Sequence, residues 1–391
     1  MDKDRNTQKE LDLSAAAQGV DADAAACEAV GAAKRDAKDR LSFLEFFAGS
    51  GLVAHALRAH FQVVWANDIC KKKATVYLAN HGARSFHLGS ISDVNGAELP
   101  EAALSWASFP CQDLSLAGLT AGIHAKRSGL VWEWLRIMDE MPNTPPLLVA
   151  ENVVGLVSSN GGSHYRLLHE ALRARGYQAG AVVLDAARWL PQSRPRVFVI
   201  AVPQAAKIPQ TLIGTRPSWL HPAAVVKAAE GLENWVWWSM PEPPQRRSGL
   251  SDIIEWNADC DPFDKAARNI AMIPERHRLM LEAQRNTVAP GYKRTRNARQ
   301  VLELRFDNVA GCLRTPEGGS SRQVVVLKNG KEIKTRLLTV RETARLMGAP
   351  ESYKLPGSYN DGYKAMGDGV AVPVARYLAR QLLRPLFTAV Q

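Results

Sequence analysis

The stretch from Leu41 to Ala59 constrains the fold more than any other part of the sequence. An apolar run, residues 41–47, contains a single acid, Glu45, and is followed by the small residues Ala-Gly-Ser-Gly at 48–51 and by a helix-forming segment. A strand that enters a helix through a glycine turn is the first unit of a doubly wound, mostly parallel sheet of the Rossmann-like α/β class. By itself, the turn would equally suit a pyrophosphate or no ligand at all.

Two acids near this turn indicate the kind of ligand. The next apolar run, residues 62–66, ends at Asn67-Asp68, where a carboxylate can accept hydrogen bonds from ribose hydroxyls; the alternative is a surface acid. Glu45 comes just before the turn, where its charge would repel phosphates and attract an ammonium or a sulfonium group. S-adenosylmethionine carries both of these cations. We therefore expect a ligand that contains adenosine, and S-adenosylmethionine before a dinucleotide.

A cysteine follows another apolar run, which ends near Ala107 and leads into the sequence Phe-Pro-Cys-Gln at 109–112. This pattern predicts a strand that delivers the thiol of Cys111 into a loop, where its thiolate could act as a nucleophile. Pro110 fixes the backbone that enters the cysteine, and Gln112 offers an amide that can hold a partner. The alternative is a buried core cysteine, because free cysteines are often buried.

An acid and two arginines occupy similar positions further along the chain. Residues 145–150 form an apolar run that ends at Glu151, and a carboxyl beside an apolar wall has a raised pKa and can donate a proton near neutral pH. The alternative is a helix N-cap. Arg194 and Arg196 precede another apolar run and point the same way on an extended segment. Two guanidiniums suit a carbonyl oxygen or a phosphate; the alternative is a solvated basic edge.

Composition adds limits on partners and compartment. The 391 residues carry a net charge of +10, which favours an anionic partner, nucleic acid before membrane, over a merely solvated basic surface. The five cysteines are odd in number and form no Cys-x-x-Cys pair, so we expect reduced thiols, a cytoplasmic setting and no structural metal. The sequence has no apolar run of about 18 residues. Residues 1–40 are rich in alanine and charge and predict a flexible leader without chemistry.

In their order along the chain, these motifs resemble those of DNA (cytosine-5)-methyltransferases of the bacterial or phage type. The resemblance covers residues 41–204 and 336–385, and it includes Arg-Leu-Leu-Thr-Val-Arg-Glu-Thr at 336–343 and Gly-Asp-Gly-Val at 367–370. It implies an S-adenosylmethionine-dependent methyltransferase with a smaller, irregular DNA-recognition domain. The implied domains are 41–204 plus 336–391 for catalysis and 205–335 for target recognition.

The resemblance also implies residue roles. Cys111 would add to carbon 6 of a flipped cytosine, Glu151 would interact with nitrogen 3, and Arg196 with the carbonyl oxygen, while Asn152 and Arg194 would support the site. The implied cofactor contacts are Phe47, Ala48, Gly49, Ser50, Gly51, Asp68, Ile69, Ser90, Ile91, Leu130, Asp368 and Val370. Three positions depart from the family pattern: Glu45 and Asp368 replace a usual Asp and a common Asn, and Ser90 stands where an Asp is common.

The segment 205–335 contains the expected DNA contacts. Between Arg285 and Arg322, eight basic residues stand against three acids, which suits a surface that follows phosphates. Within this segment, residues 313–323 supply backbone amides, hydroxyls and guanidiniums that suit close approach to a DNA backbone. The expected contacts are Arg314, Gly318, Gly319, Ser320, Ser321 and Arg322. The alternative is an ordinary hairpin turn. The tryptophans at 235, 237 and 238 are more often a small core than a platform for bases.

The best interpretation is methylation of cytosine carbon 5 in a specific double-stranded DNA sequence. We expect a monomer, with a cognate restriction endonuclease as a candidate partner. The nearest alternative is the same chemistry on tRNA. A nicotinamide-dependent oxidoreductase would explain the glycine turn and Asp68 but not Cys111 or the arginine pair, and a DNA-binding protein without catalysis would not need Cys111 and Glu151.

Overall fold

The computed structural model of the chain describes residues 40–110, 129–314 and 322–390. Cys111, Gln112 and the expected DNA contacts Gly318, Gly319, Ser320 and Ser321 lie outside the described residues, as does nearly all of the expected leader. Leu41–Gln391 form one compact unit. None of the helices in the described part of the chain has the length and apolar character needed to cross a bilayer.

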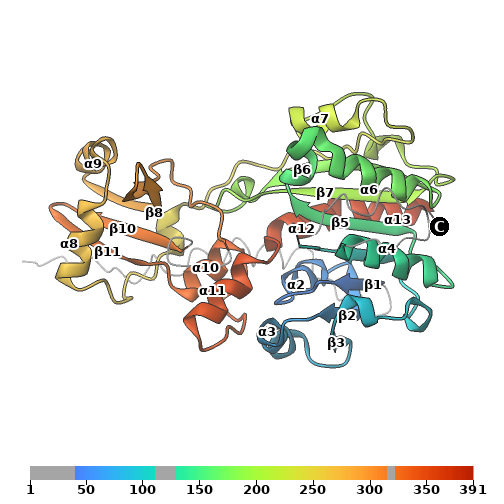
Figure 1. The fold of residues 1–391 in the computed structure, drawn as a ribbon, viewed down its shortest axis with the longest axis horizontal. Helices are drawn as coiled ribbons and strands as arrows, with labels where there is room; N and C mark the ends of the chain where they lie inside the picture. The colour runs from blue at the N-terminus through green and yellow to red at the C-terminus, as the bar shows by residue number, and fades with distance from the viewer. Residues whose placement is uncertain (1–39, 111–128, 315–321, 391) are drawn as a thin grey trace, which may run out of the picture. The chain divides into compact units, whose positions relative to one another are not determined.

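The larger of two sheets has seven strands in the order β3-β2-β1-β4-β5-β7-β6 (Figure 1). Their bounds are β1 Leu41–Phe46, β2 Phe61–Asp68, β3 Phe86–Leu88, β4 Leu104–Ala107, β5 Leu147–Val153, β6 Tyr177–Asp185 and β7 Pro195–Pro203. Neighbouring strands are parallel, except that β7 runs antiparallel to both β5 and β6. The predicted α/β class with a doubly wound, mostly parallel sheet is confirmed.

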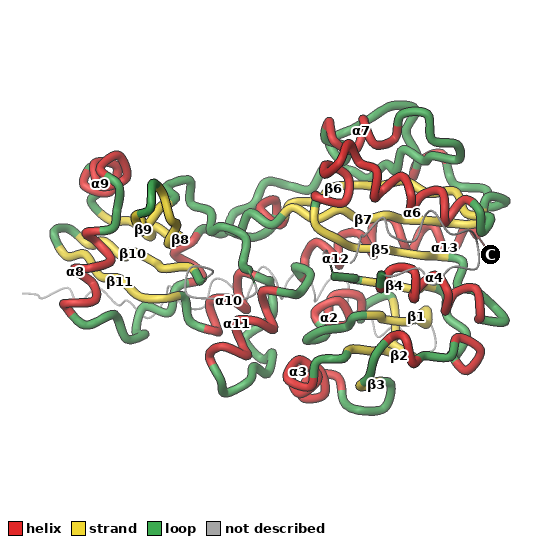
Figure 2. Tube along the Cα trace, viewed as in Figure 1, coloured by secondary structure: helices red, strands yellow, loops and turns green. Residues whose placement is uncertain are grey.

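Helices cover both faces of this sheet (Figure 2). Strand β1 shows why: Phe43 packs into one core and Leu44 and Phe46 into the other, and all three are fully buried. A strand buried on both faces reads as a nearly continuous apolar run. One face carries α2 Leu52–Leu57, α3 Lys71–His81, α12 Val372–Leu378 and α13 Arg384–Val390, and the other carries α4 Leu130–Glu140, α5 Gly155–Ser158, α6 Ser163–Arg173 and α7 Ala223–Ala229.

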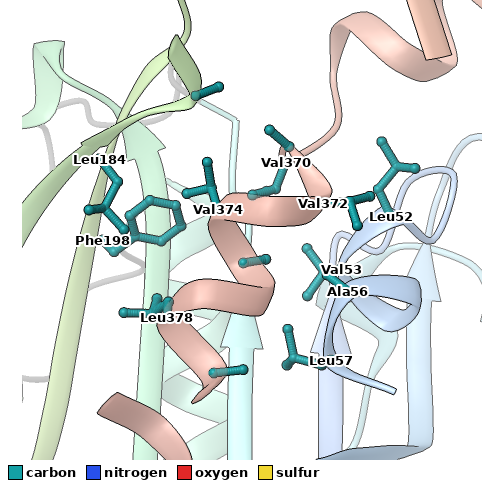
Figure 3. Packing of buried hydrophobic residues seen from close by; sticks show 14 of the residues in the cluster. Leu52, Val53, Ala56, Leu57, Leu184, Phe198, Val370, Val372, Val374 and Leu378 are labelled. Atoms are coloured by element: carbon teal, nitrogen blue, oxygen red, sulfur yellow. The ribbon is translucent and has the colours of Figure 1, made fainter. Parts of the chain in front are cut away.

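Helix α12 fills the space between helix α2 and the strands β6 and β7 (Figure 3). Val372 lies beside Leu52, whereas Val374 and Leu378 face Leu184 and Phe198. Each of these side chains is at most 2% exposed. Segments from the two ends of the described chain therefore share one core. A π-helical turn, η11 Ala379–Leu383, joins α12 to α13.

A second sheet has four antiparallel strands in the order β11-β10-β8-β9. The strands are β8 Asn286–Arg296, β9 Arg299–Leu304, β10 Gln323–Asn329 and β11 Glu332–Leu337, and the nearby helices are α8 Phe263–Ala271, α9 Glu275–Glu282, α10 Val340–Leu346 and α11 Tyr359–Gly367. Val324 and Val326 pack with α8 and α9, and Val325 between them packs into the large core on the opposite face. Short 3-10 helices lie at Ile91–Asp93, Gly96–Glu98, Ser159–Gly162, Ala186–Arg188, Gln210–Leu212 and Leu250–Ile253.

The tryptophan-rich segment packs on the larger sheet. Trp238 is fully buried, and its indole N–H donates to the carbonyl oxygens of Gly180 and Ile200, both at 3.2 Å. Trp235 and Trp237 meet edge to face with ring centroids 5.0 Å apart. This part of the segment 205–335 therefore contributes to the core beside β6 and β7, and not to the core of a smaller domain as the sequence suggested.

Candidate active site

A cavity of about 700 Å³ lies where β1, β2, β4 and β5 end. It brings together residues that are far apart in the sequence. Those expected from the sequence that line it are Phe47, Ala48, Gly49, Ser50, Asp68, Ile69, Ser90, Ile91, Pro110, Leu130, Glu151, Asn152, Arg194, Arg196, Arg314, Asp368 and Val370. Because the carboxyl ends of parallel strands meet at one edge of a sheet, this is the ligand-binding edge of a doubly wound fold.

The glycine turn forms one wall of the cavity. Phe47, Gly49 and Gly51 have φ values of 58°, 58° and 83°, and glycine adopts this left-handed region without strain. Gly51 does not line the cavity; a Cβ there would lie 2.5 Å from the ring of His81. Gly51 is therefore needed for packing, which corrects its expected role as a direct cofactor contact.

Hydrogen bonds hold the turn from three sides. Asp68 accepts from the backbone N–H of Gly49 at 2.8 Å and from that of Cys70 at 2.7 Å. Ser50 Oγ donates to the carbonyl oxygen of Ala365 in α11 at 2.9 Å. The hydroxyl of Tyr353 donates to the carbonyl oxygen of Ser50 at 2.5 Å. Asp68 thus orients the turn, and it also faces the cavity at the end of β2.

Glu45 occupies a different place from the one that the sequence suggested. Its side chain is 1% exposed, does not line the cavity, and accepts a hydrogen bond from the backbone N–H of Ala54 at 3.3 Å. Its other oxygen has no hydrogen-bond partner among the described residues. Burial raises the pKa of Glu45 to about 8, so at neutral pH the carboxyl is mostly neutral. The expectation that Glu45 attracts a cationic ligand is therefore wrong.

Glu151 and Arg196 form an ion pair at the far end of the cavity. The Nε of Arg196 lies 3.3 Å from Oε1 of Glu151, and the two side chains are 14% and 9% exposed. Burial raises the pKa of Glu151, and the positive charges of Arg196 and Arg194 partly oppose this rise. The pair comes from β5 and β7, which are antiparallel neighbours, with Val153 opposite Arg196. A buried carboxyl with a raised pKa can donate a hydrogen bond at neutral pH.

Arg194 supports the cavity wall. Its guanidinium is 2% exposed and donates to the carbonyl oxygens of Leu313 at 2.9 Å, Gly367 at 2.8 Å and Gly369 at 2.7 Å. Because Arg194 directly precedes β7, these hydrogen bonds connect the start of that strand to two later segments of the chain. The expectation that Arg194 supports the site during the reaction stays a prediction.

Asn152 positions the segment that precedes the expected nucleophile. Its side-chain amide donates to the carbonyl oxygen of Phe109 at 2.9 Å. Phe109 is buried, and Pro110 next to it lines the cavity. Pro110 immediately precedes Cys111 in the sequence. The chain therefore enters the undescribed segment from the wall of the cavity.

The expected adenine-side residues differ in exposure. Ile69 is 70% exposed at the cavity rim, whereas Ile91 is 4% exposed. Ser90 Oγ accepts from the backbone N–H of Ser92 and caps the 3-10 helix that follows. Leu130, at the start of α4, also lines the cavity.

Lys73 and Cys312 are two of the cavity residues that were not expected from the sequence. Lys73 of α3 makes an ion pair with Asp368, with Nζ 2.5 Å from Oδ2. Cys312 Sγ lies 3.2 Å from Nη1 of Arg194 and 3.9 Å from both terminal nitrogens of Arg196. Lys73 belongs to a run of three lysines that follows shortly after Asp68, the last residue of β2. This position near the end of a strand could have indicated that Lys73 lies at the ligand-binding edge of the sheet. Nothing in the sequence near Cys312 distinguished it from the other scattered thiols.

The expected DNA contacts that the structure describes are two arginines. Arg314 is exposed, lines the cavity and stacks over the ring of Tyr292, with 5.8 Å from its Cζ to the centroid. Arg322 does not line the cavity; it donates to Asn360 at 2.6 Å. They flank the undescribed segment 315–321 on its two sides. In the described ranges, no group of three or more His, Cys, Asp or Glu residues could hold a metal ion.

Comparisons with known proteins agree with this arrangement. The model of the C-5 cytosine-specific DNA methylase family matches residues 41–384. Type II methyltransferase M.BsuFI of Bacillus subtilis is 24% identical over 353 residues, 90% of this chain and 74% of that protein. Type II methyltransferase M.HhaI of Haemophilus parahaemolyticus is 25% identical over 348 residues, 87% and 93% of the two chains.

Solved structures show the same fold. The S. pombe Dnmt2 methyltransferase has a TM-score of 0.55 at 21% identity and covers 87% of this chain and 97% of its own. A putative DNA modification methyltransferase encoded within a prophage in E. coli has a TM-score of 0.54 at 18% identity, with 89% and 99% covered. Because the family model spans most of the sequence, the chain belongs to the C-5 cytosine-specific DNA methylase family.

Proposed function

We propose that this protein transfers a methyl group from S-adenosylmethionine to carbon 5 of cytosine in a specific double-stranded DNA sequence. One observation carries the proposal. A single cavity contains both the glycine turn and the Glu151–Arg196 pair, and Pro110 on its wall immediately precedes Cys111. A cofactor site and an acid-cation pair therefore lie close enough to serve one reaction.

The residues of the cavity fit S-adenosylmethionine. Asp68 ends β2 where ribose hydroxyls would lie, and the exposed Ile69 and buried Ile91 offer apolar surface to an adenine. The ion pair of Lys73 and Asp368 offers one charge of each sign. When bound, S-adenosylmethionine supplies an electrophilic methyl group. The binding contacts listed from the resemblance remain part of this proposal, except for Gly51.

Cys111 acts as the nucleophile in this proposal. Its thiolate forms a bond to carbon 6 of the cytosine, and the electron pair of the carbon 5–carbon 6 double bond moves toward the ring carbonyl and nitrogen 3. Glu151, whose pKa burial raises, interacts with nitrogen 3, and Arg196 donates to the carbonyl oxygen. Carbon 5 becomes nucleophilic and takes the methyl group, whose bond to the sulfonium sulfur breaks and leaves S-adenosylhomocysteine. A solvent base then removes the carbon 5 proton, and the electron pair of that C–H bond re-forms the double bond and expels the thiolate.

In this proposal the cytosine leaves the helix stack, because a side chain in a protein pocket cannot reach the ring carbons of a base inside a duplex. Arg314 on the cavity rim and Arg322 beyond it are the described candidates for phosphate contacts, together with residues 318–321 of the sequence. Residues 205–335 supply target recognition in this proposal, and 41–204 with 336–391 supply catalysis. We further propose a monomer in the cytoplasm, with a cognate restriction endonuclease as a partner.

A trapping experiment tests the mechanism. Duplex DNA in which 5-fluorocytosine replaces cytosine should form an adduct with the wild-type protein that survives denaturation, because fluorine at carbon 5 prevents the final elimination. The Cys111→Ser variant should form no adduct and should still bind the same DNA. Bisulfite sequencing of DNA from cells that express the protein identifies the target sites for the duplex. Absence of an adduct at every site methylated in the cell would falsify the covalent role of Cys111.

The same chemistry on tRNA is the second candidate. Matched reactions with DNA and with bulk tRNA, each with tritiated S-adenosylmethionine, separate the two substrates directly. We expect label in DNA, because Arg314 and Arg322 belong to the segment from Arg285 to Arg322, in which eight basic residues stand against three acids. Label in tRNA alone would transfer the proposal to that substrate.

A further inference from the structure

We propose that Lys73 and Asp368 together bind the charged amino-acid end of the methyl donor, so that this wall selects ligands that carry both an ammonium and a carboxylate. The inference rests on the proposed function, because it assigns the two residues to the same cofactor site. It adds Lys73 as a binding residue and gives Asp368 a defined partner.

The position of the ion pair carries the inference. Lys73 lies in the first turn of α3, and Asp368 is the C-cap residue that directly follows α11. Their side chains are 18% and 22% exposed, and both line the cavity. The pair is thus neither buried in the core nor free at the surface; it forms part of the wall that a ligand touches.

The stem of Lys73 runs along the glycine turn. A Cβ built on Gly49 would lie 4.0 Å from Cδ of Lys73, an ordinary van der Waals contact. The ammonium reaches the space between Asp368 and Asp68, and their negative charges raise the pKa of Lys73 although burial alone would lower it. Lys73 therefore stays positively charged at the place where the turn and α11 approach each other.

A neighbouring ion pair shows that α3 and α11 can be connected without placing the charges in the cavity wall. Lys72 Nζ lies 2.8 Å from Oδ1 of Asp361, which also connects α3 to α11, but neither residue lines the cavity. Lys72 is 68% exposed, and exposed pairs of this kind contribute little to stability. The two pairs therefore have the same chemistry and the same helices, and differ in whether they face the cavity.

The chemistry of the wall matches a zwitterion. The carboxylate of an amino-acid group can take a hydrogen bond from the Lys73 ammonium, and its ammonium can donate to Asp368, so each charge keeps an opposite neighbour. Such charge-assisted hydrogen bonds are stronger than neutral ones. A ligand with the same adenosine and sulfur but no amino-acid group, such as 5′-methylthioadenosine, gains neither contact.

Calorimetric titration of two probes tests the inference. S-adenosylhomocysteine carries the amino-acid group and 5′-methylthioadenosine lacks it. Lys73→Met should weaken the binding of S-adenosylhomocysteine by about tenfold or more, the loss expected for one charge-assisted hydrogen bond. The same variant should bind 5′-methylthioadenosine as the wild type does, which also shows that the cavity is folded. Asp368→Asn should likewise weaken the binding of S-adenosylhomocysteine more than the binding of 5′-methylthioadenosine.

Lys72→Met is the matched control, and it should change the affinity for neither probe. The inference is overturned if Lys73→Met binds S-adenosylhomocysteine as well as wild type does, or if it weakens both probes equally. It is also overturned if Lys72→Met has the same effect as Lys73→Met. A wild-type protein that binds neither probe refutes the proposed cofactor instead, and so the two failures are distinguishable.

Discussion

Replacing Glu45 with glutamine should stabilise the protein at pH 8 and leave its stability at pH 5 nearly unchanged. In the folded protein Glu45 is 1% exposed, and burial raises its pKa to about 8 from its ordinary value of 4.5. Between these two pH values the folded protein keeps a proton that the unfolded chain has already lost. The free energy of unfolding therefore falls as the pH rises through this window. Glutamine mimics the neutral carboxyl and keeps the oxygen that accepts from Ala54.

The size of the effect follows from the difference of the two pKa values. A gap of about 3.5 units, at about 1.36 kcal/mol per unit, corresponds to an upper bound of roughly 5 kcal/mol across the whole window. At pH 7, which is about 2.5 pH units above the ordinary pKa of Glu45, the wild-type protein has lost about 3 kcal/mol of unfolding free energy relative to a pH at which Glu45 is protonated in both the folded and the unfolded chain. A loss of this size is a large part of the stability of an ordinary domain.

Urea denaturation of both proteins from pH 5 to pH 8 measures this difference, with unfolding followed by tryptophan fluorescence. The stability of Glu45→Gln minus that of wild type should be near zero at pH 5 and should grow steadily to pH 8. Glu151 also has a raised pKa, but it is present in both proteins and cancels in the difference. A difference that stays constant over the range would refute the assignment of a buried, neutral Glu45.

Three other changes test contacts elsewhere in the fold by the same denaturation assay. Arg194→Met removes a buried guanidinium that holds three backbone carbonyls and should lower the unfolding free energy by about 3 kcal/mol; an unchanged midpoint would contradict its role as a tie. Arg336→Met leaves the fully buried Glu342 without its partner at 2.6 Å and should cost about 3–5 kcal/mol; the second change Glu342→Gln should recover part of this loss, because the amide is neutral and keeps an oxygen that accepts from a backbone N–H. Thr339→Val removes the acceptor of a capping box at the start of α10 and should cost about 1 kcal/mol; no loss would mean that the cap is dispensable.

The sequence predicted the sheet edge well because strand ends are local features. Asp68 and Glu151 each follow an apolar run, and the rule that parallel strands share one carboxyl edge brings them to the same cavity. The sheet itself could be predicted for the same reason, since its strands are short, apolar and bounded by turns.

Contacts that depend on distant parts of the chain could not be predicted in this way. Glu45 lies in the strand that leads into the glycine turn. Its carboxyl is buried because Ala54 and the surrounding core pack against it, which the local sequence does not indicate. Gly51 looks like Gly49 in sequence, yet a side chain at Gly51 would meet His81. The pairing of Lys73 with Asp368 joins helices that local patterns treat as unrelated.

The position of α12 has a consequence for how the molecule assembles as it is made. Ser50 bonds to Ala365, 315 positions later, and the helix that fills the gap beside α2 comes later still. Contacts between such distant positions slow folding, and apolar surface left waiting for them invites aggregation. The apolar face of α2 therefore stays exposed to solvent while the ribosome is still synthesising the middle of the chain. A chaperone that covers this face during synthesis would raise the yield of active protein.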